Sequence, residues 1–230
     1  MNHSTRAILT ASLLLLLATA TAAQMGMGMR PPMPRGMFNP VVGAGAVYEM
    51  VGENGEKMTM QIAVVGKESV NGKDAYWFET IMTGTPQGEM VMKSLTVLDG
   101  TNTYVARMIM QPPGRPPMEM PEQMLRMHGQ TPQPADIRSQ ADDLGIESVT
   151  VPAGTFVCHH YRIKQGTGDV WVTDKVSPYG LVKQQGNGST MVLLKVISDA
   201  RDKITGTPEP FNPAAMGMGQ PPDESAPPQY

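Results

Sequence analysis

The 230-residue chain has one cysteine, few aromatic residues and no motif that marks a common enzyme class. Because Cys158 is alone, no disulfide can form within the chain, and stability must come from a hydrophobic core or from a partner. A lone cysteine in a strand-like segment is typically a small buried hydrophobic residue, and we expect that role here.

Catalytic and metal-binding patterns are also missing. The sequence lacks the G-x-S-x-G, H-E-x-x-H and G-x-x-x-x-G-K-[ST] motifs. His159 and His160 are adjacent in a predicted strand, so their side chains point to opposite faces and cannot chelate one ion together. Cys158 and His160 share a face, but no CxxC or HxxxH spacing supplies further ligands. We predict that the protein is not an enzyme, with no catalytic residue, no metal site and no cofactor.

A strong charge of either sign is absent. The formal net charge is −3, and the acidic and basic residues are interspersed along the chain. No basic stripe is available for nucleic acid, and no polybasic segment is available for anionic lipid headgroups. We therefore expect no nucleic-acid partner.

The first 23 residues have the pattern of a secretory signal peptide. Arg6 supplies the positive charge, residues 7–20 are apolar, and the small residues at 18–23 fit a cleavage site that ends at Ala22 or Ala23. The apolar run is shorter than the roughly 20 residues of a membrane-spanning helix, and no cysteine follows it for lipidation. We predict a periplasmic or secreted protein without a transmembrane segment after signal cleavage.

Two segments are rich in Met, Gly and Pro without periodicity: residues 24–43 and residues 205–230. Such segments bury too little apolar surface to offset the entropy of ordering, so we predict a disordered arm and a disordered tail around a domain at 44–204. Both segments contain Met-Gly-Met-Gly and Phe-Asn-Pro. A common envelope protein partner is one explanation, and shared low-complexity drift is the one that we favour.

The domain has strand signals almost throughout. Short β-branched and aromatic runs alternate with turn pairs such as Asn54-Gly55, Asn71-Gly72 and Asn187-Gly188, in which both residues tolerate positive φ. Strands joined by such short turns must run antiparallel. About nine to ten strands are predicted. Several of them, such as residues 169–172, are apolar on both faces, which indicates that both faces are covered or that one lines a cavity.

The strand pattern is interrupted once, by an insertion at residues 111–144. It contains PPGRPP, which cannot supply ladder donors, then a predicted short helix at 121–128 and a second helical segment at 135–144. We expect the insertion to cover one face of the sheet, with Met120, Met124 and Met127 turned inward. The predicted fold is mainly β: a single curved antiparallel sheet, or half-barrel, with one or two short helices packed on the concave face. A closed barrel and a sandwich are the alternatives.

Three segments resemble a known group of proteins: GKESVNGKDAYWFET at 66–80, VPAGTFVCHHYRI at 151–163 and DVWVTDKVSPYGLVKQQG at 169–186. The sequence of these segments resembles that of uncharacterised exported bacterial proteins, which are similar to the outer-membrane lipoprotein-sorting proteins, the periplasmic carriers of lipoproteins. The resemblance covers residues 47–196. It implies an unclosed half-barrel whose concave, apolar face is covered by short helices and shelters an acyl chain or another apolar ligand. It implies no catalytic residues, because the carriers have none.

Methionine is unusually abundant and forms i, i+2 pairs in predicted strands. Each pair points to one face of its strand. An odd number of residues in the loop after Asp99 would place Met92 opposite Met110, and an even number would place them on opposite faces. The predicted ligand-binding residues are Met58, Met60, Trp77, Met90, Met92, Met108, Met110, Met124 and Trp171.

Two interpretations of these methionines compete. Unbranched thioether side chains adapt to irregular apolar ligands, and thioethers also favour Cu(I). We predict a non-catalytic, exported binding protein for an apolar or lipid-like ligand, such as a lipid or a lipoprotein acyl chain, in the cell envelope. The alternatives are a methionine-rich periplasmic copper-binding protein and a structural or interaction module that uses its arms.

Overall fold

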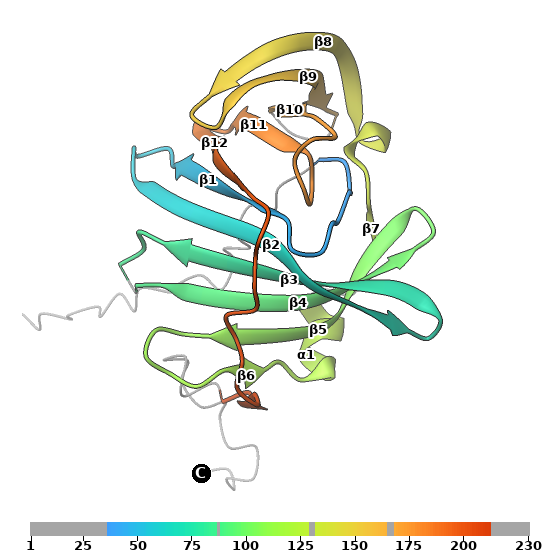
Figure 1. Cartoon of the computed structure of the whole chain (residues 1–230), viewed down its shortest axis with the longest axis vertical. Helices are drawn as coiled ribbons and strands as arrows, with labels where there is room; N and C mark the ends of the chain where they lie inside the picture. Colours follow the sequence, from blue (N-terminus) through green and yellow to red (C-terminus); the bar gives the residue numbers. More distant parts are fainter. Residues whose placement is uncertain (1–35, 87, 129–131, 165–167, 213–230) are drawn as a thin grey trace, which may run out of the picture. The chain divides into compact units, whose positions relative to one another are not determined.

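The computed structural model describes residues 36–86, 88–128, 132–164 and 168–212, and these residues form a single sheet (Figure 1). The strand order is β13-β6-β5-β4-β3-β2-β1-β12-β11-β10-β9-β8, with β7 paired to β5. The strands are β1 (Gly45–Val51), β2 (Lys57–Val70), β3 (Lys73–Thr83), β4 (Met90–Asp99), β5 (Asn102–Gln111), β6 (Met118–Glu119), β7 (Gln133–Pro134), β8 (Ala141–Val151), β9 (Gly154–Ile163), β10 (Asp169–Val172), β11 (Leu181–Gly186), β12 (Ser189–Ile197) and β13 (Glu209–Pro210). The helices are α1 (Glu122–His128) and the 3-10 helix η1 (Ile137–Ser139).

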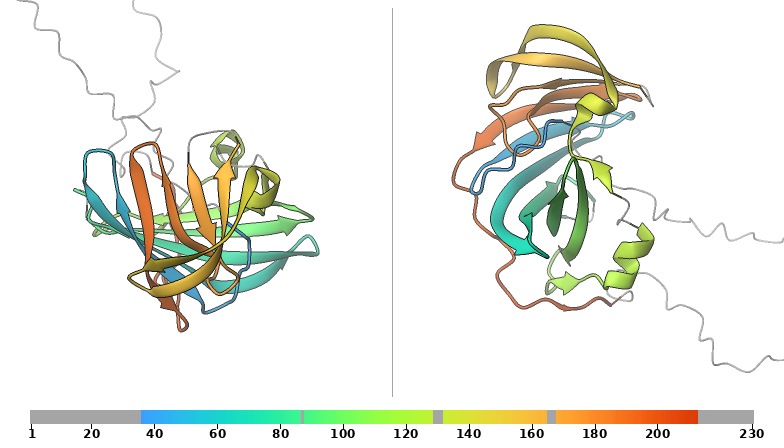
Figure 2. Two further views of the ribbon diagram at one scale, coloured as in Figure 1. Left: turned by 90° about the horizontal axis from the view of Figure 1, so that it is seen from above. Right: turned by 90° about the vertical axis from the view of Figure 1, so that its right-hand side faces the viewer.

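The predicted fold class is confirmed, since the described residues form one open, curved sheet with very little helix (Figure 2). Ten of the strands have four residues or more, in line with the predicted nine to ten, and β6, β7 and β13 have two residues each. The turns Asn71-Gly72 and Asn187-Gly188 have positive φ at both residues, which matches the right-handed twist of the strands that they join. A closed barrel and a sandwich are excluded, because β13 and β8 are the two separate ends of one strand order.

The domain begins earlier and ends later than predicted. Residues 36–43 belong to the fold, since the Met37 N–H donates to the Tyr179 carbonyl at 2.8 Å and Phe38 packs against the main buried cluster. Gly36 lies so close to Tyr179 that any Cβ would collide with its carbonyl oxygen. At the other end, β13 lies in the predicted tail and pairs with β6. The signal peptide, residues 24–35 of the arm and the tail beyond residue 212 lie outside the described residues.

The second predicted helix, at 135–144, is wrong. Only Ile137–Ser139 is helical there, as η1, and the Asp136 side chain caps it by accepting from the Arg138 N–H. From Ala141 onward the chain pairs with β9 over the whole length of β8. This long-range pairing outweighs the local helix propensity of the segment.

The sheet has two distinct faces. Partners in an antiparallel pair point to the same side, so the register places Tyr48, Met60 and Phe78 on one face. This face is concave, because its side chains from β1, β2 and β3 join those of the distant strands β9 and β10 in one buried cluster. The opposite, convex face carries Trp77 and Glu79.

Part of the concave face is filled by the chain's own side chains. The Phe38 ring centroid lies 5.9 Å from that of Phe78 and 6.1 Å from that of Tyr179, and the last two rings stack at 5.8 Å. The Tyr48 hydroxyl donates to the Leu181 carbonyl at 3.1 Å, and burial raises the pKa of Tyr48 far above its ordinary value. This part of the concave face is packed core and leaves no room for a ligand.

The insertion is held on the sheet rather than free of it. β6 and β7 both pair with β5, at its two ends. Helix α1 packs against β5 with Leu125 buried, and Figure 2 shows this helix on the concave side of the sheet. A short helix on the concave face was predicted, and it is present.

Residues 198–208, here called the strap, connect β12 to β13 across the convex face (Figure 1). Ile204 of the strap packs against Val91 and Ile109. The Glu79 carboxylate, which is 2% exposed, accepts the backbone N–H groups of Lys203 and Ile204 at 2.9 and 3.2 Å. The strap is therefore attached to β3, β4 and β5 by both apolar packing and buried hydrogen bonds.

The buried carboxylate of Glu79 gives a test of this attachment. Burial is the largest cause that raises the pKa of Glu79, and nearby Asp202 raises it further, against the two backbone donors that lower it. The folded state then holds the Glu79 proton more tightly than the unfolded state does, so this contribution to stability is present at low pH and is lost as the pH rises through the folded pKa. We expect Glu79→Gln, which keeps an acceptor oxygen, to reduce the loss of unfolding free energy as the pH rises above 4.5, the ordinary pKa of a glutamate. Urea denaturation measures this, and an unchanged pH dependence would contradict it.

Glu79→Ala is the matched second variant. It removes the acceptor and leaves two buried N–H groups without a partner, so we expect it to destabilise the protein by about 1–3 kcal/mol at any pH. Equal stability of the alanine and glutamine variants would show that the hydrogen bonds to the strap do not contribute.

Candidate functional site

Nine methionines lie side by side on the concave face, in three rows that cross neighbouring strands. Directly opposite residues have Cβ atoms about 4.5–5.5 Å apart, so the members of each row are in contact range. The core row is Met191, Met50 and Met58, on β12, β1 and β2. The middle row is Met60, Met82 and Met90, on β2, β3 and β4. The outer row is Met92, Met110 and Met118, on β4, β5 and β6.

A β-bulge decides that the outer row exists. The loop between Asp99 and Asn102 has two residues, an even number, which by itself would place Met92 and Met110 on opposite faces. The register shifts within the pair, because Leu95 faces Arg107 and Thr96 faces Val105, which leaves Ala106 as an extra residue. The extra residue restores Met110 to the position opposite Met92. The length of this loop alone therefore predicts the wrong face for Met110 relative to Met92.

The rows differ in how far they are buried in the core. The main buried cluster includes the whole core row together with Met60 and Met82. In the described part of the chain, Met90, Met92 and Met110 pack against none of the three buried clusters, and neither does the neighbouring Met108. These four side chains are half-buried. We call Met90, Met92, Met108, Met110 and the buried Met118 the methionine face.

On β4 and β5, the concave side that carries the methionine face has no ionisable side chain. The concave positions of β4 that continue from Met92 are Ser94 and Thr96, and those of β5 are Val105 and Thr103. All the charged residues of β4 and β5 point to the convex side or lie at strand ends, as Lys93 and Arg107 do. The surface is therefore apolar with a few hydroxyl groups.

The remaining predicted methionine, Met124, lies on α1, which packs against β5. Its side chain is half-buried, and Leu125 beside it is buried. The backbone before the helix is held to β5, since the Met120 N–H donates to the Met108 carbonyl at 2.9 Å. The side chain of Met127, expected to point inward, lies outside the described residues.

The two predicted tryptophans are not on this surface. Trp77 is opposite Leu95 on the convex face, where the Lys93 Nζ and the Arg107 guanidinium lie 4.9 and 5.3 Å from its ring centroid. Its Nε1–H donates to a Glu68 carboxylate oxygen at 3.3 Å. Trp171 also faces the convex side, since it pairs with His160 and Lys183. Strand alternation is the reason: both residues have the opposite parity to the concave side chains of their strands.

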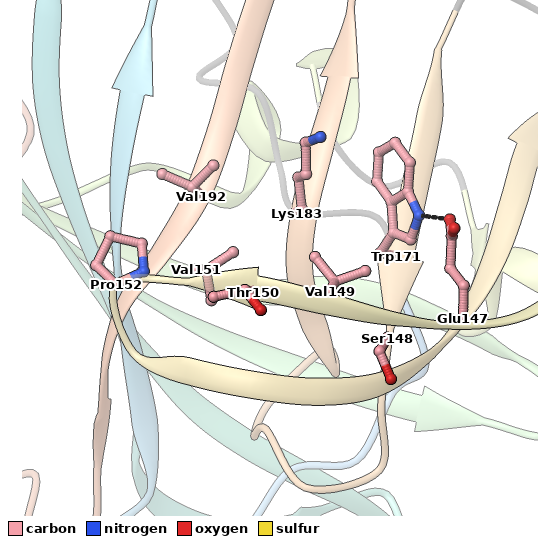
Figure 3. Close-up of a pocket in the computed structure, with 9 residues that line it drawn as sticks. All are labelled: Glu147, Ser148, Val149, Thr150, Val151, Pro152, Trp171, Lys183 and Val192. Carbon is pink, nitrogen blue, oxygen red and sulfur yellow. Dashed lines mark hydrogen bonds between the residues drawn. The ribbon is translucent and has the colours of Figure 1, made fainter.

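Trp171 instead lines a separate hollow of about 390 Å³ (Figure 3). The end of β8 passes over β10, β11 and β12 there, and the Ala153 N–H donates to the Leu193 carbonyl at 3.3 Å. The Trp171 indole donates to Glu147, and the Lys183 Nζ lies 4.5 Å from the centre of its ring. The hollow is lined by Glu147, Ser148, Val149, Thr150, Val151, Pro152, Trp171, Lys183 and Val192.

The histidines lie on opposite faces, as the sequence predicted. His159 is opposite Val172, and His160 is opposite Trp171, on which its ring stacks at 4.4 Å. His160 Nδ1 lies 3.1 Å from a Glu147 oxygen, and its Nε2 lies 3.3 Å from an Asp169 oxygen. Within the described residues no three or more His, Cys, Asp or Glu side chains are arranged to hold a metal ion.

No described helix is both long enough and apolar enough to span a membrane. The methionine face on the concave side and the hollow beside Trp171 are two candidate ligand surfaces among the described residues. The predicted ligand-binding residues include Met90, Met92, Met108 and Met110 of the methionine face but not Met118. They also omit β8, which supplies most of the lining of the hollow beside Trp171. Its exposed run Asp142 to Ser148 carried no signal for such a role.

A scan of protein-family models found no match, and a search of curated proteins found none either. Solved structures similar to this chain include a candidate lipoprotein from Parabacteroides distasonis, at 16% identity and a TM-score of 0.35, with 71% of this chain and 99% of the other covered. A candidate exported protein with a YmcC-like fold from Bacteroides fragilis has 13% identity, a TM-score of 0.36 and the same coverage. MucB in complex with MucA(peri) has 11% identity and a TM-score of 0.33, with 71% of this chain and 53% of MucB covered. TM-scores below 0.5 are too low to infer the function of one chain from another, so the proposals below rest on the residues of this chain.

Cys158 gives a test of the geometry on the convex side. It is fully buried, and burial raises the pKa of its thiol to about 11, with the charge of Glu147 adding to the effect. Because the thiolate is the reactive form, we expect the folded protein to resist 5,5′-dithiobis(2-nitrobenzoate) at about pH 8, and the urea-unfolded protein to react fully. Thiol titration by absorbance checks this. Rapid reaction of the folded protein would mean that Cys158 is accessible rather than buried.

Proposed function

We propose that this chain is an exported, non-catalytic protein that binds an apolar or lipid-like ligand on its methionine face, in the cell envelope. The observation that carries the proposal is the position of Met90, Met92, Met108 and Met110, which are contiguous, half-buried and outside the buried clusters. A contiguous apolar surface that the chain covers only in part is typical of a binding site.

The chemistry of the methionine face favours an apolar ligand. Methionine is unbranched and polarisable, so neighbouring thioethers can adapt to acyl chains of different shape without a fixed pocket. An apolar ligand that contacts Met92 and Met110 meets no charged side chain of β4 or β5, so its binding does not remove a charged group of these strands from water. The hydroxyls of Ser94 and Thr96, further along β4, offer a polar end to the surface.

The absence of an acid or base at this surface is the reason for proposing a binding role rather than catalysis. General acid–base chemistry needs a titratable group within hydrogen-bond reach of the substrate, and the concave positions of β4 and β5 supply none. Export is proposed from the sequence of residues 1–23 alone. The ligand would then be one that is present outside the cytoplasm, such as a lipid or a lipoprotein acyl chain.

A fluorescent fatty acid, 11-(dansylamino)undecanoate, tests the proposal. We expect the wild-type protein to bind it with enhanced fluorescence, and the double change Met92→Gln and Met110→Gln to weaken binding by about tenfold or more. Glutamine has a similar length, but its amide would have to lose water at an apolar contact. Equal dissociation constants for the two proteins, from fluorescence titration, would refute the site.

The matched control is Val157→Gln. Val157 is 62% exposed on β9, away from the methionine face, so the same kind of change should leave the dissociation constant unaltered. Native mass spectrometry of protein purified from an envelope extract gives an independent measurement. Retained lipid in the wild type and its loss in the double variant are the expected results.

A further inference from the structure

The outer row places three thioether sulfurs on three adjacent strands. Met110 on β5 is directly opposite Met92 on one side and directly opposite Met118 on the other. Neighbouring Cβ atoms in such a row are about 4.5–5.5 Å apart, and the flexible methionine side chain can turn its sulfur toward a point above the middle residue. Three sulfurs can therefore converge on one position.

We propose that Met92, Met110 and Met118 bind one Cu(I) ion through their thioether sulfurs. Soft thioether ligands favour Cu(I) over ions that require oxygen or nitrogen ligands. The concave positions of β4 and β5 offer no carboxylate or imidazole, so these two strands supply no ligand set for Zn²⁺, Mg²⁺ or Ca²⁺. The absence of charge thus contributes to selectivity for this ion.

The backbone that carries the third sulfur is fixed. Met118 is buried, and its strand β6 lies between β5 and β13. On the convex side of the same strand, the Arg107 guanidinium donates to both carboxylate oxygens of Glu119 at 2.7 and 3.1 Å, which holds β6 in register with β5. Without β6, which belongs to the proline-rich insertion, the row would have two sulfurs instead of three.

Core packing explains the other two rows better than it explains this one. The core row and the first two residues of the middle row belong to the main buried cluster, where methionine acts as a filler of irregular space. Met92 and Met110 belong to no buried cluster of the described residues. Two further sulfurs lie nearby, since Met90 precedes Met92 by two residues and Met108 is diagonal to it, within reach of long side chains.

The Cu(I) site goes beyond the proposed function and does not rest on it. An apolar ligand needs the apolar surface of the row, whereas Cu(I) needs its sulfur atoms. Met→Leu keeps the volume and the apolar character and removes the sulfur, usually at a cost of less than about 1.5 kcal/mol. The triple change Met92→Leu, Met110→Leu and Met118→Leu therefore removes the proposed Cu(I) ligands without making the surface polar, so a loss of Cu(I) binding reports on the sulfur atoms alone.

The experiment is an anaerobic titration of the full chain with Cu(I), kept reduced with ascorbate and in competition with bicinchoninate. The control is the triple change Met191→Leu, Met50→Leu and Met58→Leu, which removes the same number of sulfurs from the core row and leaves every other methionine in place. We expect the outer-row variant to bind one Cu(I) per chain fewer than the wild type, and the core-row variant to match the wild type.

X-ray absorption at the copper edge supplies the second measurement. A shell of sulfur neighbours in the wild type supports the site, and a shell of only nitrogen or oxygen overturns it. Equal Cu(I) binding by the two triple variants also overturns it. If a triple variant fails to fold by circular dichroism, the single changes Met92→Leu and Met110→Leu decide, and wild-type affinity in both would refute the proposal.

Discussion

The extra residue Ala106 in β5 is the constraint on which the candidate site depends. A sheet has a side-chain period of two, so a shift of one residue moves every following side chain to the other face. Without the bulge, the position opposite Met92 would be taken by Ile109, and Met108 and Met110 would face the convex side. Instead Ile109 contacts the strap on the convex side, and the two methionines face the concave side. The single extra residue thus places Ile109 in the convex contact with the strap and both methionines on the concave face.

The two faces of β3, β4 and β5 have different chemistry. The convex face carries Trp77 between the cations of Lys93 and Arg107, and the strap covers part of it through Ile204 and the buried Glu79. Burial of the Glu79 carboxylate is offset there by two backbone N–H groups that donate to it. The concave face has no charge on β4 or β5 and ends in half-buried methionines. The convex face of these strands is therefore charged and partly covered by the strap, whereas the concave face is apolar and only partly covered.

Curvature divides the concave face again. Next to β1, rings from three separate segments, Phe38, Phe78 and Tyr179, fill the space between strands that are far apart in the sheet. Toward β6 the same face is covered only in part, by α1 and the ends of the insertion. The lipoprotein-carrier resemblance implied an apolar concavity under short helices. The described residues provide that surface only over β4 to β6, and the finer family assignment stays a prediction.

Local chemistry in the sequence was enough to predict the strands, their antiparallel pairing and the turns. Asn71-Gly72 and Asn187-Gly188 determine their hairpins because each residue accepts positive φ, and the alternation around His159 and His160 determines that they face opposite sides. Tertiary structure decided what depends on pairing and packing between segments: the bulge at Ala106, the order at residues 36–43, the replacement of a predicted helix by β8, and the convex positions of Trp77 and Trp171. The physical reason is that a strand's own residues set its period, whereas its register and the face that becomes buried are set by the strands beside it.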